Sequence, residues 1–590
     1  MAPQERKSQV GLPEATGPDG WDRLPLWAWG LFLVAIPHLP SQDGPAHLLT
    51  GASLVGWLQG EPLPRVLFEL RPWFLTNWLS ILVLGGLQAV GFGAAWAEKI
   101  WLLVVLAPWV EAFARLRLRL GTSRWVPWLV LLLFQGWIAR LGLWSFLFAT
   151  GLGLWVWSRR RAGALEWIDH LLLVLALVAH PMGPLVFVGL AVLEDLVGRR
   201  FDAWRAWGPH LVLAALVAAM GSDGRPVFPA PEWPDALGRS LGPWSEALHL
   251  GAWSRLAMLG VLILASVVGW QTRRRTPERR VMGIAVLALV LASSFGPTAL
   301  GSGSVLRPRM AFLAWALLFL ALPLNGPLPR RWRWVSVLLP VSLLAALAPP
   351  MVHSWRLAVD QRVLLDALPR LSAGSVVTSS SHSEGGHYRD WLTAPSLHLA
   401  DRWLVEQGGW DPFTYPAQTE HFPLVARFWL GEPLVNYLHW RPSRLPLESW
   451  APVLDAYCVI DAPSEDLDAL EGRMEGSWDR LSRSERHVCF ASRQALPVQE
   501  RFREPWDLTP RQPPAPVALD PRLPASFVLG ADPSHAHWSW RAFVRDANGR
   551  LRPVGTDVVR PNQGHFDAHG RVAIESWAAP EEGVVVLLSG

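Results

Sequence analysis

Apolar runs alternate with short polar joints along the first 349 residues, and beyond Pro349 charged residues are spaced as in an ordinary soluble protein. Apolar runs approaching about 20 residues are typical of helices that cross a membrane. We therefore predict a polytopic α-helical membrane protein of about eleven spans. They fall at 25–41, 97–114, 125–139, 142–158, 167–181, 184–198, 207–221, 251–270, 281–296, 309–324 and 333–349.

Arginine clusters between these runs predict how the chain is oriented. They lie at 115–124, 159–161, 199–200, 273–280 and 330–333. Basic clusters favour the cytoplasmic side, so the pattern predicts an integral plasma (inner) membrane protein with a cytoplasmic N-terminus and an extracytoplasmic C-terminal domain.

Residues 73–93 are also apolar enough to span, but counting them would invert every later cluster. We predict instead a re-entrant or interfacial helix pair on the outer face, broken at Gly85-Gly86.

The pattern divides the chain into four parts. They are a disordered cytoplasmic N-terminus (1–23), a transmembrane helical domain (24–349) with an outer interfacial or re-entrant segment (43–96), an extracytoplasmic α/β domain (350–507) and a small β-rich module (517–590). Strands are expected at 374–380, 456–463 and 487–493, and in the module near 527–533, 538–546, 571–577 and 583–590.

Composition supports the membrane interpretation. Hydrophobic residues make up 51% of the 590 and charged residues only 17%, where a soluble domain has nearer a quarter charged. The net charge of +4 does not indicate a nucleic-acid partner, because the arginines are spaced as orientation signals. The two cysteines, Cys458 and Cys489, fall in predicted strands of the outer domain. We expect two buried free thiols rather than a bridge, which would need Cα atoms within about 7 Å.

The sequence Pro37–His47 carries the strongest candidate chemistry. Asp43 follows the first span and precedes a helix predicted to run to about Leu58. Asp43 and His47 are four residues apart and so share one helix face, which suits a metal ion or a proton relay. An alternative stays open: Asp43, before Gly-Pro, is also a good helix N-cap, and His47 can simply be interfacial.

An aspartate just after the first span, followed by interfacial helices, resembles the GT-C class of membrane glycosyltransferases. The hairpin at 125–161, turning near Arg140-Leu141-Gly142, and the later Ala179-His180-Pro181 are similar to relatives of that class. The resemblance implies a polyprenyl-phosphate-linked sugar donor, an essential acidic residue in the first outer loop and an outer C-terminal domain. The chain departs from the class pattern at the next outer turn, which offers Arg140 and no carboxylate. Glu61 and Glu69 are possible acidic partners.

On this resemblance Asp43 and His47 are the catalytic candidates, and Asp43 would deprotonate an acceptor or hold a divalent cation. The acceptor would be a glycan, a lipid or a protein. The donor phosphate would be bound by arginines, which suit bidentate contacts: Arg71, Arg140, Arg307 and Arg309.

Other sites and functions remain open. In the outer domain His382, Glu384 and His387, with His398 and Asp401 downstream, form a candidate metal or acceptor site. A non-catalytic membrane scaffold whose outer domain binds a partner is the alternative function. A transporter is disfavoured, because the predicted spans carry few charges away from their ends and show no inverted repeat.

Overall fold

The computed structural model describes residues 18–71, 77–160, 165–198, 207–214, 277–297, 306–321, 335–381, 395–412, 414, 422–426, 447–474, 476–497 and the six strands of the C-terminal module. The first seventeen residues, predicted to be disordered, lie outside this set. Residues 20–23, included in that prediction, are instead the start of a capped helix. The chain forms two compact units, one of residues 1–427, 438–445 and 454–493, the other of 428–437, 446–453 and 494–590.

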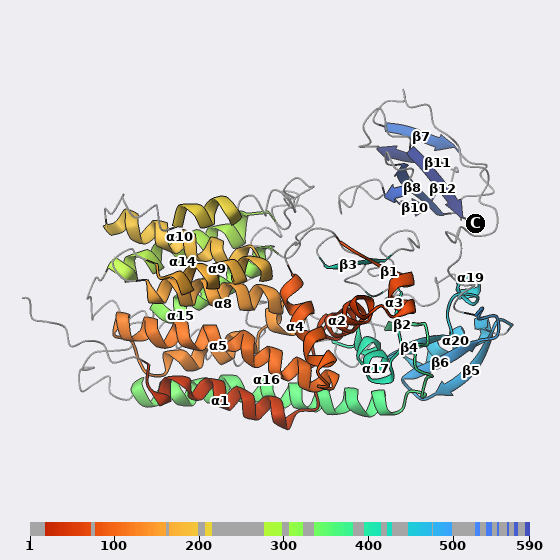
Figure 1. The fold of residues 1–590 in the computed structure, drawn as a ribbon, viewed down its shortest axis with the longest axis horizontal. Coiled ribbons are helices and arrows are strands. Elements are labelled where there is room, and N and C mark those ends of the chain that lie inside the picture. Colours follow the sequence, from red (N-terminus) through yellow and green to blue (C-terminus); the bar gives the residue numbers. More distant parts are fainter. Residues whose placement is uncertain are drawn as a thin grey trace, which may run out of the picture. The chain divides into compact units, whose positions relative to one another are not determined.

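A bundle of helices makes up most of the first unit (Figure 1). Its members are α1 (Gly20–Ala35), α5 (Ala94–Leu120), α8 (Trp144–Arg159), α9 (Trp167–Ala179), α10 (Met182–Gly198), α14 (Pro277–Phe295) and α15 (Leu306–Ala321). Helix α5 packs on α8, α8 on α9 and α10, and α14 on α10 and α15. Large aromatic side chains fill the core, including the fully buried indoles of Trp29, Trp101, Trp109, Trp144 and Trp157.

Among the described residues, no helix is both long and apolar enough to cross a membrane. The eleven spans are therefore not confirmed. The predicted span 125–139 is not one helix: it is divided into η1 (Val126–Trp128), α6 (Leu129–Phe134) and the start of α7 (Trp137–Leu141). The predicted span 251–270 lies outside the described residues, and 207–221 is described only as far as residue 214.

The segment after α1 folds against one end of the bundle. It contains α2 (Gly44–Gln59), α3 (Pro62–Leu67), β1 (Phe68–Leu70) and α4 (Trp78–Ala89). The expected break at Gly85-Gly86 is wrong, because α4 continues through both glycines. A Cβ on Gly85 would lie 2.5 Å from the carbonyl oxygen of Gly51 in α2, so this glycine allows two helix backbones to touch. At 12 residues α4 is about 18 Å long, shorter than a bilayer core of about 30 Å.

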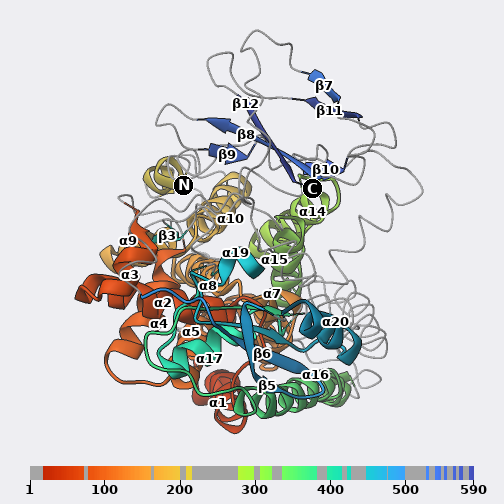
Figure 2. The same cartoon turned by 90° about the vertical axis from the view of Figure 1, so that its right-hand side faces the viewer.

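Helix α16 (Val335–Asp366) leads from the bundle to the sheet. It passes without interruption through 349 and 350, where the sequence predicted a domain boundary. The sheet has the order β2-β4-β6-β5, with β2 (Val377–Ser381) parallel to β4 (Ala456–Ile460), and β6 (His487–Ser492) antiparallel to both β4 and β5 (Trp478–Arg483). Helices α17 (Leu399–Gln407) and α20 (Ser464–Met474) belong to this part, which faces the viewer in Figure 2.

The two cysteines lie directly opposite each other in β4 and β6, with Cα atoms 4.2 Å apart, and they form a disulfide. The expectation of two free thiols is therefore wrong. It gave too little weight to direct strand pairing, which brings opposite side chains within bonding reach.

A short antiparallel ladder ties the N-terminal and later parts of the first unit together. Strand β1 pairs with β3 (Leu424–Ala426), and the N–H of Arg71 donates to the carbonyl of Pro423 over 2.9 Å. Residues about 350 positions apart in sequence are thereby joined next to α2.

The second unit carries the predicted β module and the short helix α19 (Leu447–Trp450). Strand β8 (Ser539–Arg545) pairs with β9 (Leu551–Pro553), β10 (Gln563–His565) and β12 (Val584–Ser589), while β7 (Ser526–Gly530) pairs with β11 (Arg571–Glu575). The four strands expected here are all present.

Candidate functional site

Asp43 occupies the N-cap position of α2, but its side chain makes no capping hydrogen bond. Pro45 in the first helical turn already lacks an N–H that would need a cap. The helix therefore begins without using the carboxylate, and the interpretation of Asp43 as a simple cap does not hold. Both the residue and His47 are buried.

The turn between α7 and α8 holds the Asp43 backbone in place. The N–H of Gln42 donates to the carbonyl of Arg140 (2.8 Å), and the N–H of Asp43 donates to that of Leu141 (3.1 Å). Gly142 has φ +96°, a conformation that glycine adopts without steric cost. A Cβ on Gly142 would lie 3.0 Å from the Cβ of Asp43, so the turn and the aspartate are in van der Waals contact.

An imidazole from the far end of the chain lies beside the carboxylate. His398, immediately before α17, has Nε2 3.9 Å from Asp43 Oδ1, and its Nδ1 is 3.8 Å from Oδ2 of Asp401, one turn into the same helix. All three side chains are buried. The result is a row of carboxylate, imidazole and carboxylate.

Burial dominates the electrostatics of this row. It raises the pKa of Asp43 to about 7, because a low-dielectric environment disfavours the charged form. Burial and the neighbouring carboxylate of Asp411 raise the pKa of Asp401 well above its usual value. Burial lowers the pKa of His47 to about 4. Near neutral pH Asp43 can thus exchange a proton.

Three buried polar atoms, on residues next to Asp43 in sequence or in the row, have no hydrogen-bond partner among the described residues. They are Ser41 Oγ, His47 Nδ1 and Asp401 Oδ2, each fully shielded from solvent. Buried polar atoms are normally paired, so these three are candidates to meet the polar groups of a ligand. The ring of His47 itself packs between the rings of Trp144 (5.9 Å) and Phe422 (5.4 Å).

One of the predicted phosphate-binding arginines, Arg140, is hydrogen-bonded to neighbouring parts of the fold. Arg140 donates through Nε and Nη2 to Gln135, and through Nη2 also to the carbonyl of Pro350 in α16. Its guanidinium therefore joins α7 to α16.

Arg307 donates to the carbonyl of Gly296 (2.7 Å). Arg309 lies 3.1 Å from His180 Nε2 and stacks over the ring of Phe146, near the start of α8. Arg307 and Arg309 thus lie at the end of the bundle that carries the α7–α8 turn. Whether they reach the same ligand as Asp43 stays a prediction.

The remaining candidates lie on the segment between α2 and α4. Glu61 and Glu69 are exposed, at the start of α3 and in β1, and Arg71 follows β1. His382, Glu384 and His387 lie outside the described residues. Within the described part of the chain no group of three or more His, Cys, Asp or Glu residues is arranged to hold a metal ion. The predicted divalent cation stays a prediction.

Sequence reasoning missed a buried ion pair behind the site. Arg402, next to Asp401 in α17, donates to Glu98 in α5 over 2.7 Å, and both side chains are fully buried. Glu98 also accepts from the N–H of Leu39 (3.3 Å). A lone carboxylate at the start of an apolar run needs a cationic partner. That rule could have flagged Glu98, but not a partner 304 residues away.

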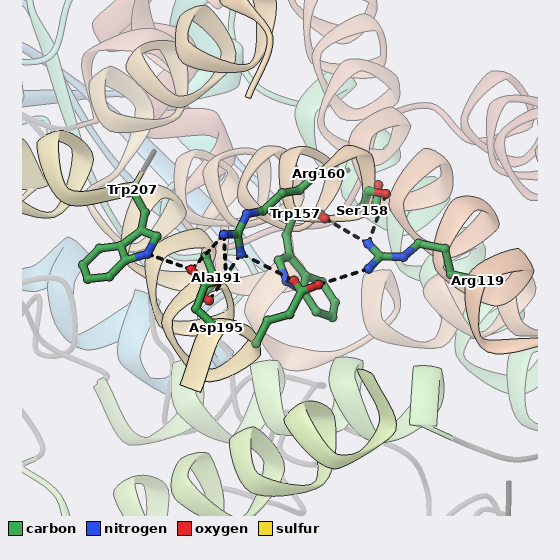
Figure 3. Close-up of polar contacts among 8 residues, drawn as sticks. Arg119, Trp157, Ser158, Arg160, Ala191, Asp195 and Trp207 are labelled. Carbon is green, nitrogen blue, oxygen red and sulfur yellow. Dashed lines mark hydrogen bonds and ion pairs between the residues drawn. The ribbon is translucent and has the colours of Figure 1, made fainter. Parts of the chain in front are cut away.

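Arginines of two of the clusters used for orientation, 115–124 and 159–161, lie near each other at the other end of the bundle (Figure 3). Arg160 donates to both carboxylate oxygens of Asp195 (2.8 Å each), and the indole N–H of Trp207 donates to the same carboxylate. Arg119 donates to the carbonyl of Trp157 at the end of α8. The bundle thus separates this basic end from the end that carries Asp43.

Comparison with known proteins gives one structural similarity. No family model matches the chain, and no curated protein matches it. The chain is similar to the solved structure of ArnT from Cupriavidus metallidurans in the apo state, at 13% sequence identity, with 81% of this chain and 98% of the ArnT chain covered and a TM-score of 0.39. A likeness of this degree carries no argument about what this chain does, so the function proposed below rests on its own residues.

Proposed function

We propose that this protein is a membrane glycosyltransferase that moves a sugar from a polyprenyl-phosphate donor to an acceptor on the outer face of the membrane. The observation that carries the proposal is Asp43, a buried carboxylate that its helix does not use as a cap and that lies beside the imidazole of His398. A carboxylate so placed is available for chemistry.

Exposed apolar stripes support the membrane location. Along α1, Trp27, Leu31 and Val34 are exposed at intervals of four and three residues, the spacing of one helix face. Helix α9 repeats the pattern with Trp167, Leu171 and Val174, and α14 with Ile284, Leu287, Leu291 and Phe295. Contiguous exposed apolar surface marks contact with a membrane or another protein, and stripes on several helices of one bundle suit surrounding lipid.

The reaction follows from the chemistry of a lipid-linked sugar. Asp43 accepts the proton of an acceptor hydroxyl, the oxygen forms a bond to the sugar's anomeric carbon, and the bond from that carbon to the phosphate oxygen breaks. The polyprenyl phosphate leaves with the electron pair. A base works best when its pKa is near the working pH, and the pKa of Asp43 meets this condition. Arg307 and Arg309, at the same end of the bundle, are the proposed cations for the departing phosphate.

A transfer assay tests the proposal. The protein in liposomes is given polyprenyl-phosphate donors that carry different radiolabelled sugars, with membrane lipid and glycan extracts as acceptors. We expect label to leave the donor and Asp43→Asn to reduce the rate by about 10²–10⁴. Asp479→Asn, which changes an exposed carboxylate that pairs with Arg493, serves as the comparison and should cost far less. If no donor is used, or if Asp43→Asn transfers sugar at the wild-type rate, the proposal is wrong and the scaffold function takes its place.

A further inference from the structure

One set of hydrogen bonds joins the connection between α1 and α2 to α17 through the bundle helix α5. Oε2 of Glu98 in α5 accepts from the N–H of Leu39 (3.3 Å) and from Nη2 of Arg402 in α17 (2.7 Å). Neither charged side chain has any exposed surface. Leu39 lies four residues before Asp43, and Arg402 lies four residues after His398. The ion pair therefore ties both halves of the site to one helix.

A second set of hydrogen bonds makes the same connection through α16. Nε2 of His38 donates to Oε1 of Gln361 over 2.9 Å, and Nε2 of Gln361 donates to the carbonyl of Pro395 over 2.9 Å. These directions hold because an amide oxygen and a backbone carbonyl only accept. Pro395 comes three residues before His398, so the segment that carries His398 is held on both sides of it.

Apolar packing brings α17 to α2 but does not set its register. The helix packs on α2 and shares a buried apolar cluster with Leu49 of α2 and with both cysteines of the disulfide. Contacts of this kind are non-directional. The guanidinium of Arg402, in contrast, must bring an N–H to an oxygen of Glu98. The cost of burying two charges offsets their attraction, so the pair contributes position rather than stability.

We propose that Glu98 and Arg402 are positioning residues that set the register of α17 on the bundle and so hold His398 against Asp43; this inference rests on the function proposed above. Nε2 of His398 lies 3.9 Å from Oδ1 of Asp43, and the imidazole covers one side of the carboxylate. Glu98 and Arg402 act through the placement of α17. A displacement of about 1 Å at a reacting group can lower a rate about 10²-fold.

The pKa of Asp43 reports on this placement. Burial raises that pKa to about 7, and a displaced α17 would admit water to the carboxylate and lower it. Glu98 and Arg402 carry opposite charges, so their joint removal leaves the net charge near Asp43 unchanged. The titratable groups on the elements packed around Asp43 are His47 on α2, Arg140 in the adjoining turn, and His398 and Asp401 at the start of α17.

The double variant Glu98→Gln with Arg402→Met tests the inference. It leaves no buried charge alone, and the new amide oxygen can still accept from the N–H of Leu39. We expect its unfolding temperature in detergent to stay near that of wild type, and sugar transfer to fall at least about 10-fold. We also expect the midpoint at which Asp43 titrates to fall by about one pH unit or more. The infrared C=O stretch of the protonated carboxyl group, assigned by its loss in Asp43→Asn, measures that midpoint.

Arg160→Met with Asp195→Asn is the matched control. It removes a buried ion pair at the other end of the bundle, and the new amide oxygen can still accept from the indole of Trp207. The rate and the midpoint of this control should equal those of wild type.

Three results overturn the inference and leave the proposed function standing. They are a wild-type rate or midpoint in the Glu98→Gln, Arg402→Met protein, a clear loss of its thermal stability, and equal changes in the control. The midpoint needs no substrate, so it decides the inference even if no donor is used.

Discussion

At the scale of single residues, Asp43 accounts for most of the proposed chemistry, and it should impose a cost on folding. Its pKa is about 7 in the folded protein against an ordinary value of 3.8. The folded state therefore holds the proton more tightly than the unfolded state between about pH 4 and 7. Stability should decrease as pH rises through this window and level off above it.

Replacing Asp43 with asparagine should remove that cost. The difference of about 3 pH units corresponds to at most about 4 kcal/mol, so Asp43→Asn should be more stable than wild type at pH 8 and similar at pH 4. Thermal unfolding of both proteins in detergent at the two pH values measures this. Destabilisation of the variant at pH 8 would mean that the carboxylate is a structural partner after all.

The sequence located this residue but not its surroundings. Asp43 and His47 stand out because they are four residues apart just after an apolar run. His398 and Asp401 were assigned to a different site, with His382 and His387, because nothing local in a sequence indicates which loop a distant helix will face. The α2–α17 packing that joins them is a long-range contact.

At the scale of elements, the approach of α2 to α4 depends on one glycine of a pair. Gly85→Ala would place a methyl group 2.5 Å from the carbonyl of Gly51, whereas a Cβ on Gly86 meets nothing within 4 Å. We expect Gly85→Ala to destabilise the protein by about 1–3 kcal/mol. Gly86→Ala should stabilise it by up to about 1 kcal/mol through helix propensity. Denaturant unfolding measures the free energy of unfolding of each variant. Equal changes in the two variants would contradict this packing of α2 on α4.

A second pair of glycine variants, Gly142→Ala and Gly91→Ala, tests the turn that holds Asp43. Gly142 and Gly91 both have φ +96°, but only Gly142 touches Asp43. Gly142→Ala and Gly91→Ala should therefore share the backbone strain of about 1 kcal/mol, while only the first displaces the carboxylate. We expect Gly142→Ala to lower sugar transfer 10-fold or more and Gly91→Ala to leave it near wild type. Equal rates for the two variants would show that the turn does not position the site.

Secondary structure was predictable where a single hydrophobic pattern extended over the whole segment. The buried strands β2, β4 and β6 were all expected, because short runs with valine and other β-forming residues marked them. Strand β5 was missed: its sequence, WDRLSR, is mostly polar, as suits an exposed edge strand paired on one side only. The break at Gly136 was missed for the opposite reason, since leucines on both sides of it continue the apolar pattern that a single helix would show.

At the scale of the whole molecule, the disulfide reports on the compartment of the sheet. Disulfides such as Cys458–Cys489 form and persist mainly in oxidising compartments, so the redox state of the pair in cells tests the extracytoplasmic placement that the sequence predicts for the C-terminal part. Alkylation of the protein isolated from its membranes should add no label to either cysteine, and two labels after reduction. Mass spectrometry measures the number of labels on the two cysteines in each sample. Full labelling without reductant would place the sheet on the reducing side.

The most direct test of the account is the pH dependence of sugar release from the polyprenyl-phosphate donor. If Asp43 is the base, the rate should rise tenfold per pH unit below about pH 7, where the carboxyl group is protonated, and level off above it. Asp43→Asn should show a low rate without this rise. A wild-type profile that is flat between pH 5 and 8, or a rise that survives in Asp43→Asn, would contradict the assignment of Asp43 as the catalytic base.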